Sequence, residues 1–382
     1  DVVAFLGSLV TNGLDGALGE RTQNFSDLLW QRTGSKFELA IEAAIPENRR
    51  KTLRDIAFDT VRYEICLGID EETSETVIQT EKVLLKTKSA NERRSPQTFF
   101  PTSHFPPSTI VSSKGHKGTQ TVINKVHHGN DNFYSEVYQE KGKGWAPAFK
   151  LGPRKSALGN LPEDESKFPV ATWLKQLLTD GVQQYVLNSL LIRKASPPGQ
   201  TRGLKPDGSN LPWVVDALQR NNPASFASWI EHLKTALPEL ENIRTIERPD
   251  DRHRYLMLCY RGGLEVPSWM ASDGTLRLLA LTLPAYLPDF TGVYLIEEPE
   301  NGIHPRAVET MFQSLSSVYD AQILLASHSP VILGMVDVKD VLCFAKTPDG
   351  ATDIVLGRQH PALRDWQGTT SLGTLFAGGV LG

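Results

Sequence analysis

The feature that most constrains the fold is a short apolar run that ends in two adjacent carboxylates. Residues 293–296 are Val-Tyr-Leu-Ile, and Glu297 and Glu298 follow them directly. A continuous apolar run of this length is typical of a buried strand in a parallel sheet, and ligands bind at the carboxyl edge of such sheets. Adjacent strand residues point to opposite sides, so one carboxylate can face a magnesium ion and the other a water molecule. A strand that ends in a solvated acidic turn explains the same residues.

The last third of the chain predicts alternating strands and helices. One helix is expected after Ser272 and another after Pro305, because proline suits the first position of a helix. Apolar runs at 323–326, 341–345 and 354–356 predict further strands. This alternation predicts a parallel sheet that is covered by helices.

Two other segments in this region carry groups that suit an anion. Ser272 can cap the helix that follows it, and Gly274 lies in the first turn. The free N–H groups of such a helix start bind anions, although an ordinary N-cap uses the same residues. The strand at 323–326 ends in His328, which two serines flank. This histidine can contact a phosphate oxygen or an attacking water, although a lone histidine at a strand end is more often structural.

The order of these three segments resembles the carboxyl-terminal half of an ABC-type ATPase head. The segments are Ser272-Asp273-Gly274, Glu297-Glu298-Pro299 and Ser327-His328-Ser329-Pro330. They are similar to those of the soluble bacterial "AAA, ABC-like" ATPases related to the RecF and OLD groups, many of which are phage-defence components. The resemblance implies an α/β fold of the P-loop NTPase type, in which a β-rich lobe and a helical insertion accompany the ATPase head.

The resemblance implies catalytic and metal-binding roles at the ends of the two strands. Glu298 would polarise the attacking water, and His328 would sense the γ-phosphate. Glu297 would lie on the magnesium side, where most ABC proteins have aspartate and this group also accepts glutamate. The ligands that follow from the resemblance are ATP and Mg²⁺.

The resemblance also implies that the nucleotide is enclosed between two subunits with two-fold symmetry. The helix start of one subunit would cap the γ-phosphate that the partner holds, and the loop after the carboxylates would carry signals across the dimer. The implied nucleotide-binding residues are Ser272, Asp273 and Gly274, which act in trans, and Asn301. The expected assembly is a dimer or a dimer of dimers.

One motif of these ATPases does not occur among the 382 residues. No segment matches the phosphate-binding pattern G-x-x-x-x-G-K-[S/T]. Residues 1–10 have apolar side chains at helical spacing with no capping residue before them, which is typical of a helix entered partway along. We therefore expect the P-loop to lie immediately before Asp1.

Composition narrows the possible setting and partners. Forty basic and 44 acidic residues give a net charge of −4, so any contact with nucleic acid would be local. The basic stretch 114–155 can follow a phosphate backbone, or it can be an ordinary surface insertion. Three separated cysteines and the lack of a signal peptide predict a cytoplasmic protein. No membrane span is expected, and the most apolar candidate is 276–290.

Other chemistries find less support in the sequence. His127 and His128, followed by Asn130 and Asn132, are similar to a fragment of a metal-dependent nuclease. No further histidine stands at a suitable spacing, so a loop is the expected structure. No paired Asp-x-Asp motif supports a Toprim nuclease.

Three regions are expected along the chain. They are an amino-terminal part of the ATPase head with the β-rich lobe and basic insertion (1–160), a helical subdomain (161–268) and the α/β lobe with the three motifs (269–382). The function implied by the resemblance is ATP hydrolysis by a subunit that regulates a separate effector, such as a nuclease, in DNA-related or anti-phage defence. The alternative is a non-hydrolysing scaffold that sequesters a toxin or effector protein.

Overall fold

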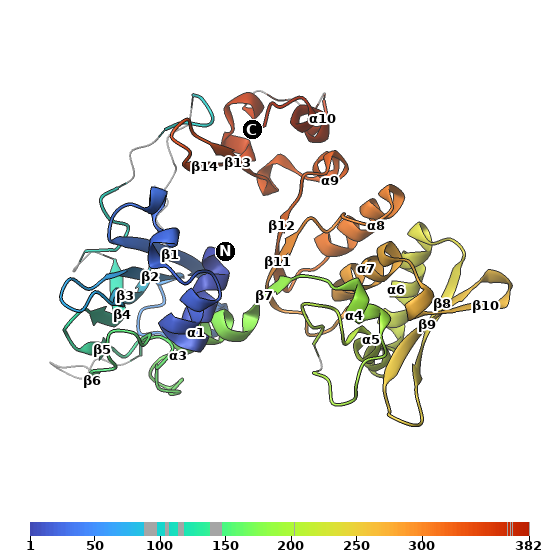
Figure 1. The fold of residues 1–382 in the computed structure, drawn as a ribbon, viewed down its shortest axis with the longest axis horizontal. Coiled ribbons are helices and arrows are strands. Elements are labelled where there is room, and N and C mark those ends of the chain that lie inside the picture. The colour runs from blue at the N-terminus through green and yellow to red at the C-terminus, as the bar shows by residue number, and fades with distance from the viewer. Residues whose placement is uncertain are drawn as a thin grey trace. The chain divides into compact units, whose positions relative to one another are not determined.

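Separate hydrophobic cores divide the chain of the computed structural model into two units (Figure 1). The structure describes residues 1–87, 98–103, 107–113, 118–137, 147–201, 203–364, 366, 368 and 370–381. Unit 1 comprises Asp1–Arg94 and Phe105–Val182, and unit 2 comprises Ser95–His104 and Gln183–Gly382. The expected regions 161–268 and 269–382 contribute to one core in unit 2.

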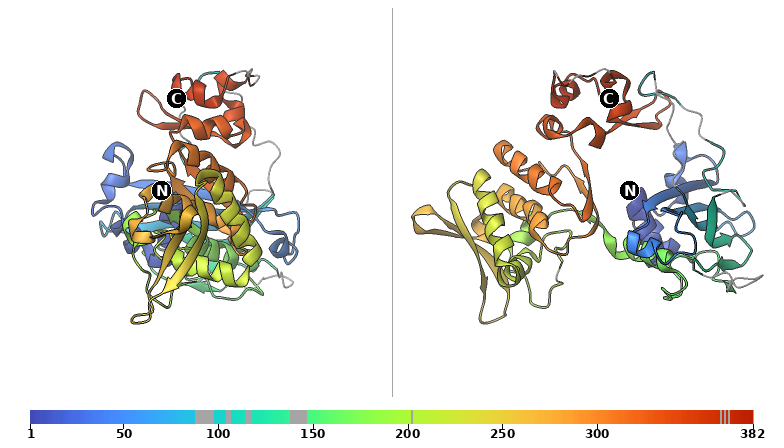
Figure 2. Two further views of the ribbon diagram at one scale, coloured as in Figure 1. Left: turned by 90° about the vertical axis from the view of Figure 1, so that its right-hand side faces the viewer. Right: turned by 180° about the vertical axis from the view of Figure 1, so that it is seen from behind.

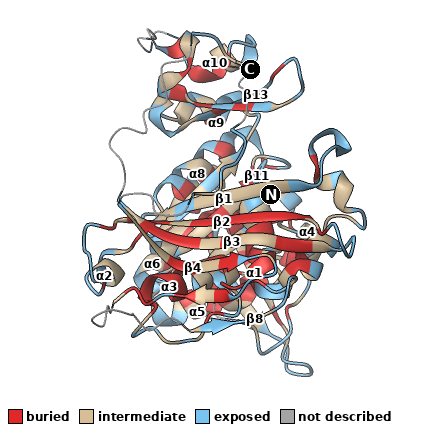
Figure 3. Cartoon of the chain, turned by 90° about the vertical axis from the view of Figure 1, so that its left-hand side faces the viewer, coloured by how far each residue is buried: buried red, intermediate tan, exposed pale blue. Residues whose placement is uncertain are grey.

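Unit 1 is built on a six-stranded antiparallel sheet in which each strand pairs with the next one along the chain. Its strands are β1 (Lys36–Ala44), β2 (Thr60–Ile69), β3 (Thr76–Lys86), β4 (Thr119–Val126), β5 (Asp131–Phe133) and β6 (Ala148–Phe149). Its helices are α1 (Val2–Gly19), α2 (Glu47–Arg50) and α3 (Pro169–Gln176). Most of β2 and β3 is buried, whereas most of β1 is half-buried (Figure 3). The six strands of this sheet therefore form an antiparallel meander.

The first helix packs its apolar side into the core of unit 1. Phe5, Leu6 and Leu9 of α1 belong to the same buried cluster as Tyr63 and Ile65 of β2. Among the described residues, α1 also meets the length and composition test for a membrane span, with a mean hydropathy of 1.3 over 18 residues. The core helix of a soluble protein and a signal sequence pass the same test. The sequence predicted a helix over residues 1–10, but the most apolar candidate for a span was expected at 276–290.

A buried carboxylate fastens a loop to the central strands of unit 1. Glu81 of β3 is fully buried and accepts hydrogen bonds from the Tyr63 hydroxyl at 3.0 Å and the Ser156 hydroxyl at 2.7 Å. It also accepts from the backbone N–H groups of Ala157 and Leu158 at 2.7 and 2.9 Å. Four donors compensate for the loss of hydration of this carboxylate, as a buried polar group requires.

A second buried carboxylate caps α3 from outside the helix. The side chain of Glu136 accepts hydrogen bonds from the backbone N–H groups of Val170 at 2.7 Å and Ala171 at 2.8 Å. These N–H groups lie in the first turn, where a helix has no internal acceptors for them. Burial raises the pKa of Glu136 to about 7, although the two N–H groups and the nearby Arg49 favour the ionised form.

Unit 2 contains two three-stranded sheets, a two-stranded hairpin and the helices around them (Figure 1). The first sheet has the order β12–β11–β7 and the second has the order β10–β9–β8. The strands are β7 (Val182–Tyr185), β8 (Leu240–Glu247), β9 (Arg254–Tyr260), β10 (Leu264–Pro267), β11 (Gly292–Glu297), β12 (Ala321–Ala326), β13 (Leu342–Lys346) and β14 (Thr352–Leu356). The helices are α4 (Ser189–Arg193), α5 (Leu211–Asn221), α6 (Pro223–Ala236), α7 (Asp273–Thr282), α8 (Pro305–Ser316), α9 (Pro330–Met335) and α10 (Leu372–Ala377).

Two expectations about unit 2 are wrong in part. The region 161–268 is not simply helical, because it contains β7 and the antiparallel sheet β8–β10, whose yellow and orange strands lie beside the yellow-green helices α5 and α6 in Figure 2. The strands β13 and β14 form an antiparallel hairpin and do not extend the parallel sheet. The strands β11 and β12 show the expected parallel pairing, with Glu297 opposite Ala326.

The pKa of Glu136 gives unit 1 a testable dependence on pH. An exposed glutamic acid in the unfolded chain loses its proton near its ordinary pKa of 4.5, whereas Glu136 in the folded chain holds its proton to about pH 7. The folded state therefore binds more protons within this window, and the contribution of Glu136 to stability falls as the pH rises.

We expect the free energy of unfolding of the wild type, relative to Glu136→Gln, to fall by about 2–3 kcal/mol between roughly pH 5 and pH 8. Urea unfolding of both proteins at several pH values measures this difference. Parallel pH profiles for the two proteins would contradict the assignment.

Candidate functional site

Two neighbouring parallel strands bring polar residues to one edge of the sheet in unit 2. β11 ends at Glu297 and β12 ends at Ala326, and these two residues are register partners (Figure 1). The backbone N–H of Glu298 donates to the carbonyl of Ala326 at 2.8 Å. The segments that begin at Glu298 and Ser327 therefore leave the sheet side by side, as expected for ligand-binding loops of a parallel sheet.

Glu298 is held by the loop that follows β11. Its φ of +43° places it in the left-handed region, which costs a residue other than glycine roughly 1–2 kcal/mol. The side-chain amide of Asn301 donates to the Glu298 carboxylate, and the Asn301 backbone N–H donates to the Glu298 carbonyl at 3.1 Å. The expected alternation along a strand does not apply to Glu298, because it lies beyond β11. Backbone strain of this kind is concentrated at functional sites.

Glu297 presents an exposed carboxylate beside the next strand of the sheet. Its side chain accepts a long hydrogen bond of 3.5 Å from the amide of Gln184, on β7. Among the described residues, no lysine or arginine forms an ion pair with Glu297 or Glu298. Carboxylate and amide oxygens are the donors that Mg²⁺ prefers. The exposed carboxylate of Glu297 therefore fits the magnesium side of a nucleotide site.

A hydrogen bond that was not expected from the sequence links the loops after β11 and β12. The Ser327 hydroxyl donates to Glu300 at 2.6 Å and accepts from the backbone N–H of Ser329 at 2.9 Å. The other carboxylate oxygen of Glu300 is buried and has no hydrogen-bond partner in the described part of the chain. The positions of both residues after predicted strands were a signal, but their pairing depends on the register of β11 and β12.

His328 is exposed at the start of the loop after β12. Its ring centroid lies 6.3 Å from that of Phe376, on α10. Among the described residues, none forms a hydrogen bond with the imidazole, so its nitrogen atoms are free to contact a ligand.

Ser272 caps α7, as the sequence predicted. Its hydroxyl accepts from the Thr275 backbone N–H at 3.1 Å, and it shares a hydrogen bond of 2.8 Å with the Thr275 hydroxyl. The next residue, Asp273, forms an ion pair with Arg193, whose Nε lies 3.1 Å from the carboxylate. Arg193 also donates to the Trp269 carbonyl at 3.1 Å. The ordinary capping role is present here, and it leaves Ser272 and Asp273 exposed.

The start of α7 contacts the loop after β11 through backbone atoms. A Cβ atom added to Gly274 would lie only 2.4 Å from the carbonyl oxygen of Gly302, which itself has a φ of +77°. Two glycines thus let the α7 start and this loop approach closely within one subunit.

The basic stretch 114–155 is partly neutralised where the structure describes it. Lys125 is buried and pairs with Asp131 at 2.7 Å, and Arg154 forms an ion pair with Asp15. Four of its lysines (Lys114, Lys117, Lys141 and Lys143) lie outside the described residues. DNA contact through this stretch stays a prediction.

The close approach of Gly274 to Gly302 predicts that a glycine-to-alanine change lowers the stability of the protein at the start of α7 but not in α9. Gly274→Ala should lower the free energy of unfolding by about 1–3 kcal/mol, because the loop carbonyl must move. Gly334→Ala is the control, because a Cβ at Gly334 of α9 meets no atom within 4 Å. Alanine there should be neutral or stabilising by up to roughly 1 kcal/mol. Urea unfolding measures both variants, and equal effects would contradict the close approach.

Comparison with known proteins adds a family and a fold. The family model described as "AAA domain, putative AbiEii toxin, Type IV TA system" matches residues 53–334. No curated protein matches the chain. Among solved structures, it is similar to an Smc head bound to the C-winged helix domain of ScpA, with a TM-score of 0.47 and 14% identity over 92% of this chain and 85% of that chain.

Two further structures show partial similarity. One comes from work on ATP-driven dimerization and DNA-stimulated activation of SMC ATPases, with a TM-score of 0.30 and 17% identity over 37% of this chain and 88% of that chain. The other is an Smc head domain with an extended coiled coil from Pyrococcus furiosus, with a TM-score of 0.30 and 16% identity over 39% of this chain and 40% of that chain. The expected α/β P-loop NTPase fold is confirmed, and the chain belongs to the AAA-domain family whose model spans most of its length.

Proposed function

We propose that this chain is an ATP-hydrolysing subunit that pairs with a second copy around ATP and regulates a separate effector. The observation that carries this proposal is the shared edge of β11 and β12. There, two exposed carboxylates, one of them held by Asn301 on strained backbone, lie beside the loop that bears His328. Carboxylates next to a sheet edge with a free imidazole suit phosphoryl transfer to water.

The residues at this edge divide the chemistry between them. Glu298 accepts a hydrogen bond from the attacking water and orients it, and Asn301 fixes the carboxylate through its side-chain amide. Glu297, one residue earlier, lies on the magnesium side. Mg²⁺ bound with ATP would offset the negative charge that develops on the phosphate. His328 donates to a γ-phosphate oxygen and so distinguishes ATP from ADP.

The start of α7 supplies the contact from the partner subunit in this proposal. Ser272, Asp273 and Gly274 are at the first turn of a helix whose unpaired N–H groups attract anions. Arg193 holds Asp273, which leaves the Ser272 hydroxyl and the backbone of Gly274 to face the γ-phosphate. Because Gly274 packs on Gly302, the partner's ATP is also coupled to the loop that contains Asn301.

The proposed role beyond ATP hydrolysis concerns defence. The family description names a toxin of a type IV toxin–antitoxin system, which supports a link to an effector that must be kept under control. We propose further that the protein is related to the RecF and OLD groups, that it acts in the cytoplasm and that the effector it regulates is a nuclease. The same description favours one alternative, a scaffold without hydrolysis that sequesters a toxin. The two functions differ in whether ATP is turned over.

Replacement of one carboxylate tests the proposed chemistry. Glu298→Gln in the full-length protein should reduce steady-state ATP turnover by about 10²-fold or more, because the amide cannot act as the water-orienting base. Glu309→Gln is the matched control, because Glu309 is exposed on α8 and accepts a hydrogen bond of 3.1 Å from the side-chain amide of Gln313, one turn later in the same helix. Phosphate release measures turnover. Equal and negligible turnover in the wild type and Glu298→Gln would support the scaffold and contradict the enzyme.

A further inference from the structure

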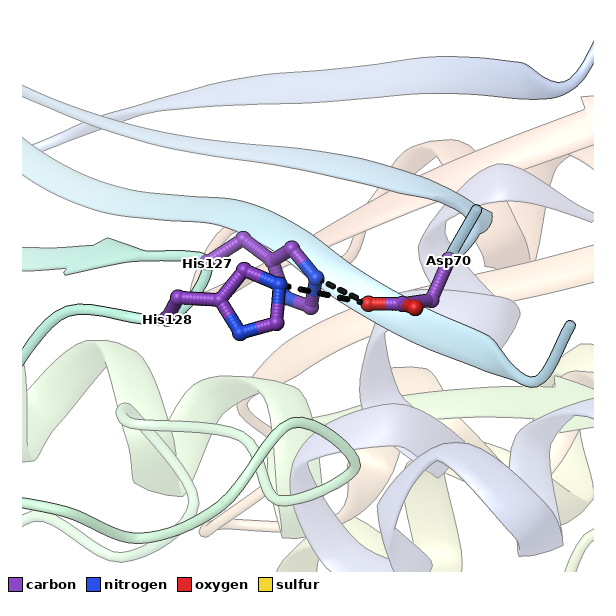
Figure 4. Close-up of side chains that lie close together, drawn as sticks. All are labelled: Asp70, His127 and His128. Carbon is purple, nitrogen blue, oxygen red and sulfur yellow. Dashed lines mark hydrogen bonds and ion pairs between the residues drawn. The ribbon is translucent and has the colours of Figure 1, made fainter. Parts of the chain in front are cut away.

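The geometry points to a metal site in unit 1 that is separate from the candidate ATP site. We assign it to Asp70, His127 and His128, and its ligand is a first-row divalent transition-metal ion such as Zn²⁺ (Figure 4). Asp70 follows β2, and both histidines follow β4. One donor atom from each residue lies within 4.8 Å of the other two.

Asp70 is a carboxylate with little exposure and no lysine or arginine partner among the described residues. Asp70 is 5% exposed, and one carboxylate oxygen accepts from the backbone N–H groups of Glu72 and Thr73 at 2.9 and 2.8 Å. The other oxygen faces the two histidines. The turn after β2 therefore fixes the carboxylate so that this second oxygen is available to a cation.

The two imidazoles supply the remaining donors from one turn. Nε2 of His127 contacts Asp70 Oδ2, and Nε2 of His128 lies 3.5 Å from the same oxygen. The rings lie 3.7 Å apart between centroids, and both point toward Asp70 in Figure 4. Donors that share one ion at roughly 2.1 Å lie about 3–4 Å apart. The distance of 3.5 Å between His128 Nε2 and Asp70 Oδ2 already lies in this range. A small rotation of the His127 ring would lengthen the closer contact between its Nε2 and the same oxygen.

The backbone of His128 gives an independent reason to regard the arrangement as built. His128 has a φ of +60° in a turn that the Gly129 N–H closes onto the Val126 carbonyl at 2.9 Å. This third position of a turn, with positive φ, usually holds glycine or asparagine. A histidine with an exposed side chain is strained there, yet the strain aims its ring at Asp70.

The donor set selects the class of ion. Two imidazoles and one carboxylate suit Zn²⁺ and other first-row divalent ions, and three protein ligands leave positions open for water or a substrate. The turn after β2 also carries Glu71, Glu72 and Glu75, whose negative charge attracts a cation. The sequence near His127 and His128 offers no further histidine at a suitable spacing, and Asp70 is 57 positions away from His127 in the chain.

A structural hydrogen bond between His127 and Asp70 is the competing explanation, and it gives His128 no role. The experiment titrates Zn²⁺, and in parallel Co²⁺, into the chelator-treated full-length protein without nucleotide and with excess Mg²⁺. Calorimetry reports affinity, and the visible spectrum of Co²⁺ reports its coordination. The variants are Asp70→Asn, which keeps an oxygen for the turn, and His128→Asn, which suits a positive φ. His253→Asn is the control, because His253 pairs with Asp251 and no other described histidine joins that pair.

We expect one equivalent of Zn²⁺ to bind to the wild type and to His253→Asn with equal affinity. His128→Asn and Asp70→Asn should each weaken this binding at least tenfold, and Zn²⁺ should raise the Tm of the wild type but not of these variants. A wild type that binds no Zn²⁺ would overturn the assignment. Unchanged binding by folded His128→Asn would do the same, because it would leave only the structural hydrogen bond.

Discussion

The parallel pairing of β11 with β12 is the constraint on which the candidate ATP site depends. This pairing sets Glu297 opposite Ala326, and the N–H of Glu298 adds one more hydrogen bond to the Ala326 carbonyl before the chain turns. A change of register by one residue would move the polar ends of the two strands out of alignment and turn their side chains to the other face. The apolar residues of the two strands therefore determine where the carboxylates and the histidine meet.

Three short-range contacts then shape this edge into a site. Asn301 holds the Glu298 carboxylate, Ser327 joins the two loops through Glu300, and the α7 start rests on Gly302. Each contact is made by backbone or by a side chain with few rotatable bonds, so little conformational freedom is lost on ligand binding. Movement of the loop after β11 would therefore displace both Glu298 and the start of α7. This coupling suits the proposed dimer, in which each subunit contributes Glu298 to one ATP site and Ser272 to the other.

Much of this edge could be predicted from local sequence, and the rest could not, for identifiable reasons. The strands at 293–296 and 323–326 and the cap at Ser272 depend on neighbouring residues, and all are present. The sheet β8–β10 was missed because charged residues interrupt its apolar pattern, although Leu256 and Leu258 of β9 alternate with half-buried positions. The contact of Asp70 with the histidines requires the registers of β2, β3 and β4, which no local pattern specifies.

The central claim is that each ATP is enclosed by Glu298 of one subunit and Ser272 of its partner. ATP turnover by an equimolar, exchanged mixture of Ser272→Arg and Glu298→Gln tests it most directly, because each variant alone has two defective sites per dimer. A mixed dimer regains one intact site, formed by Glu298 of the Ser272→Arg subunit and Ser272 of the Glu298→Gln subunit. After statistical exchange of subunits, ATP turnover should therefore recover to about a quarter of the wild-type value. Turnover of the mixture no higher than the mean of the two inactive variants, with subunit exchange verified, would contradict it.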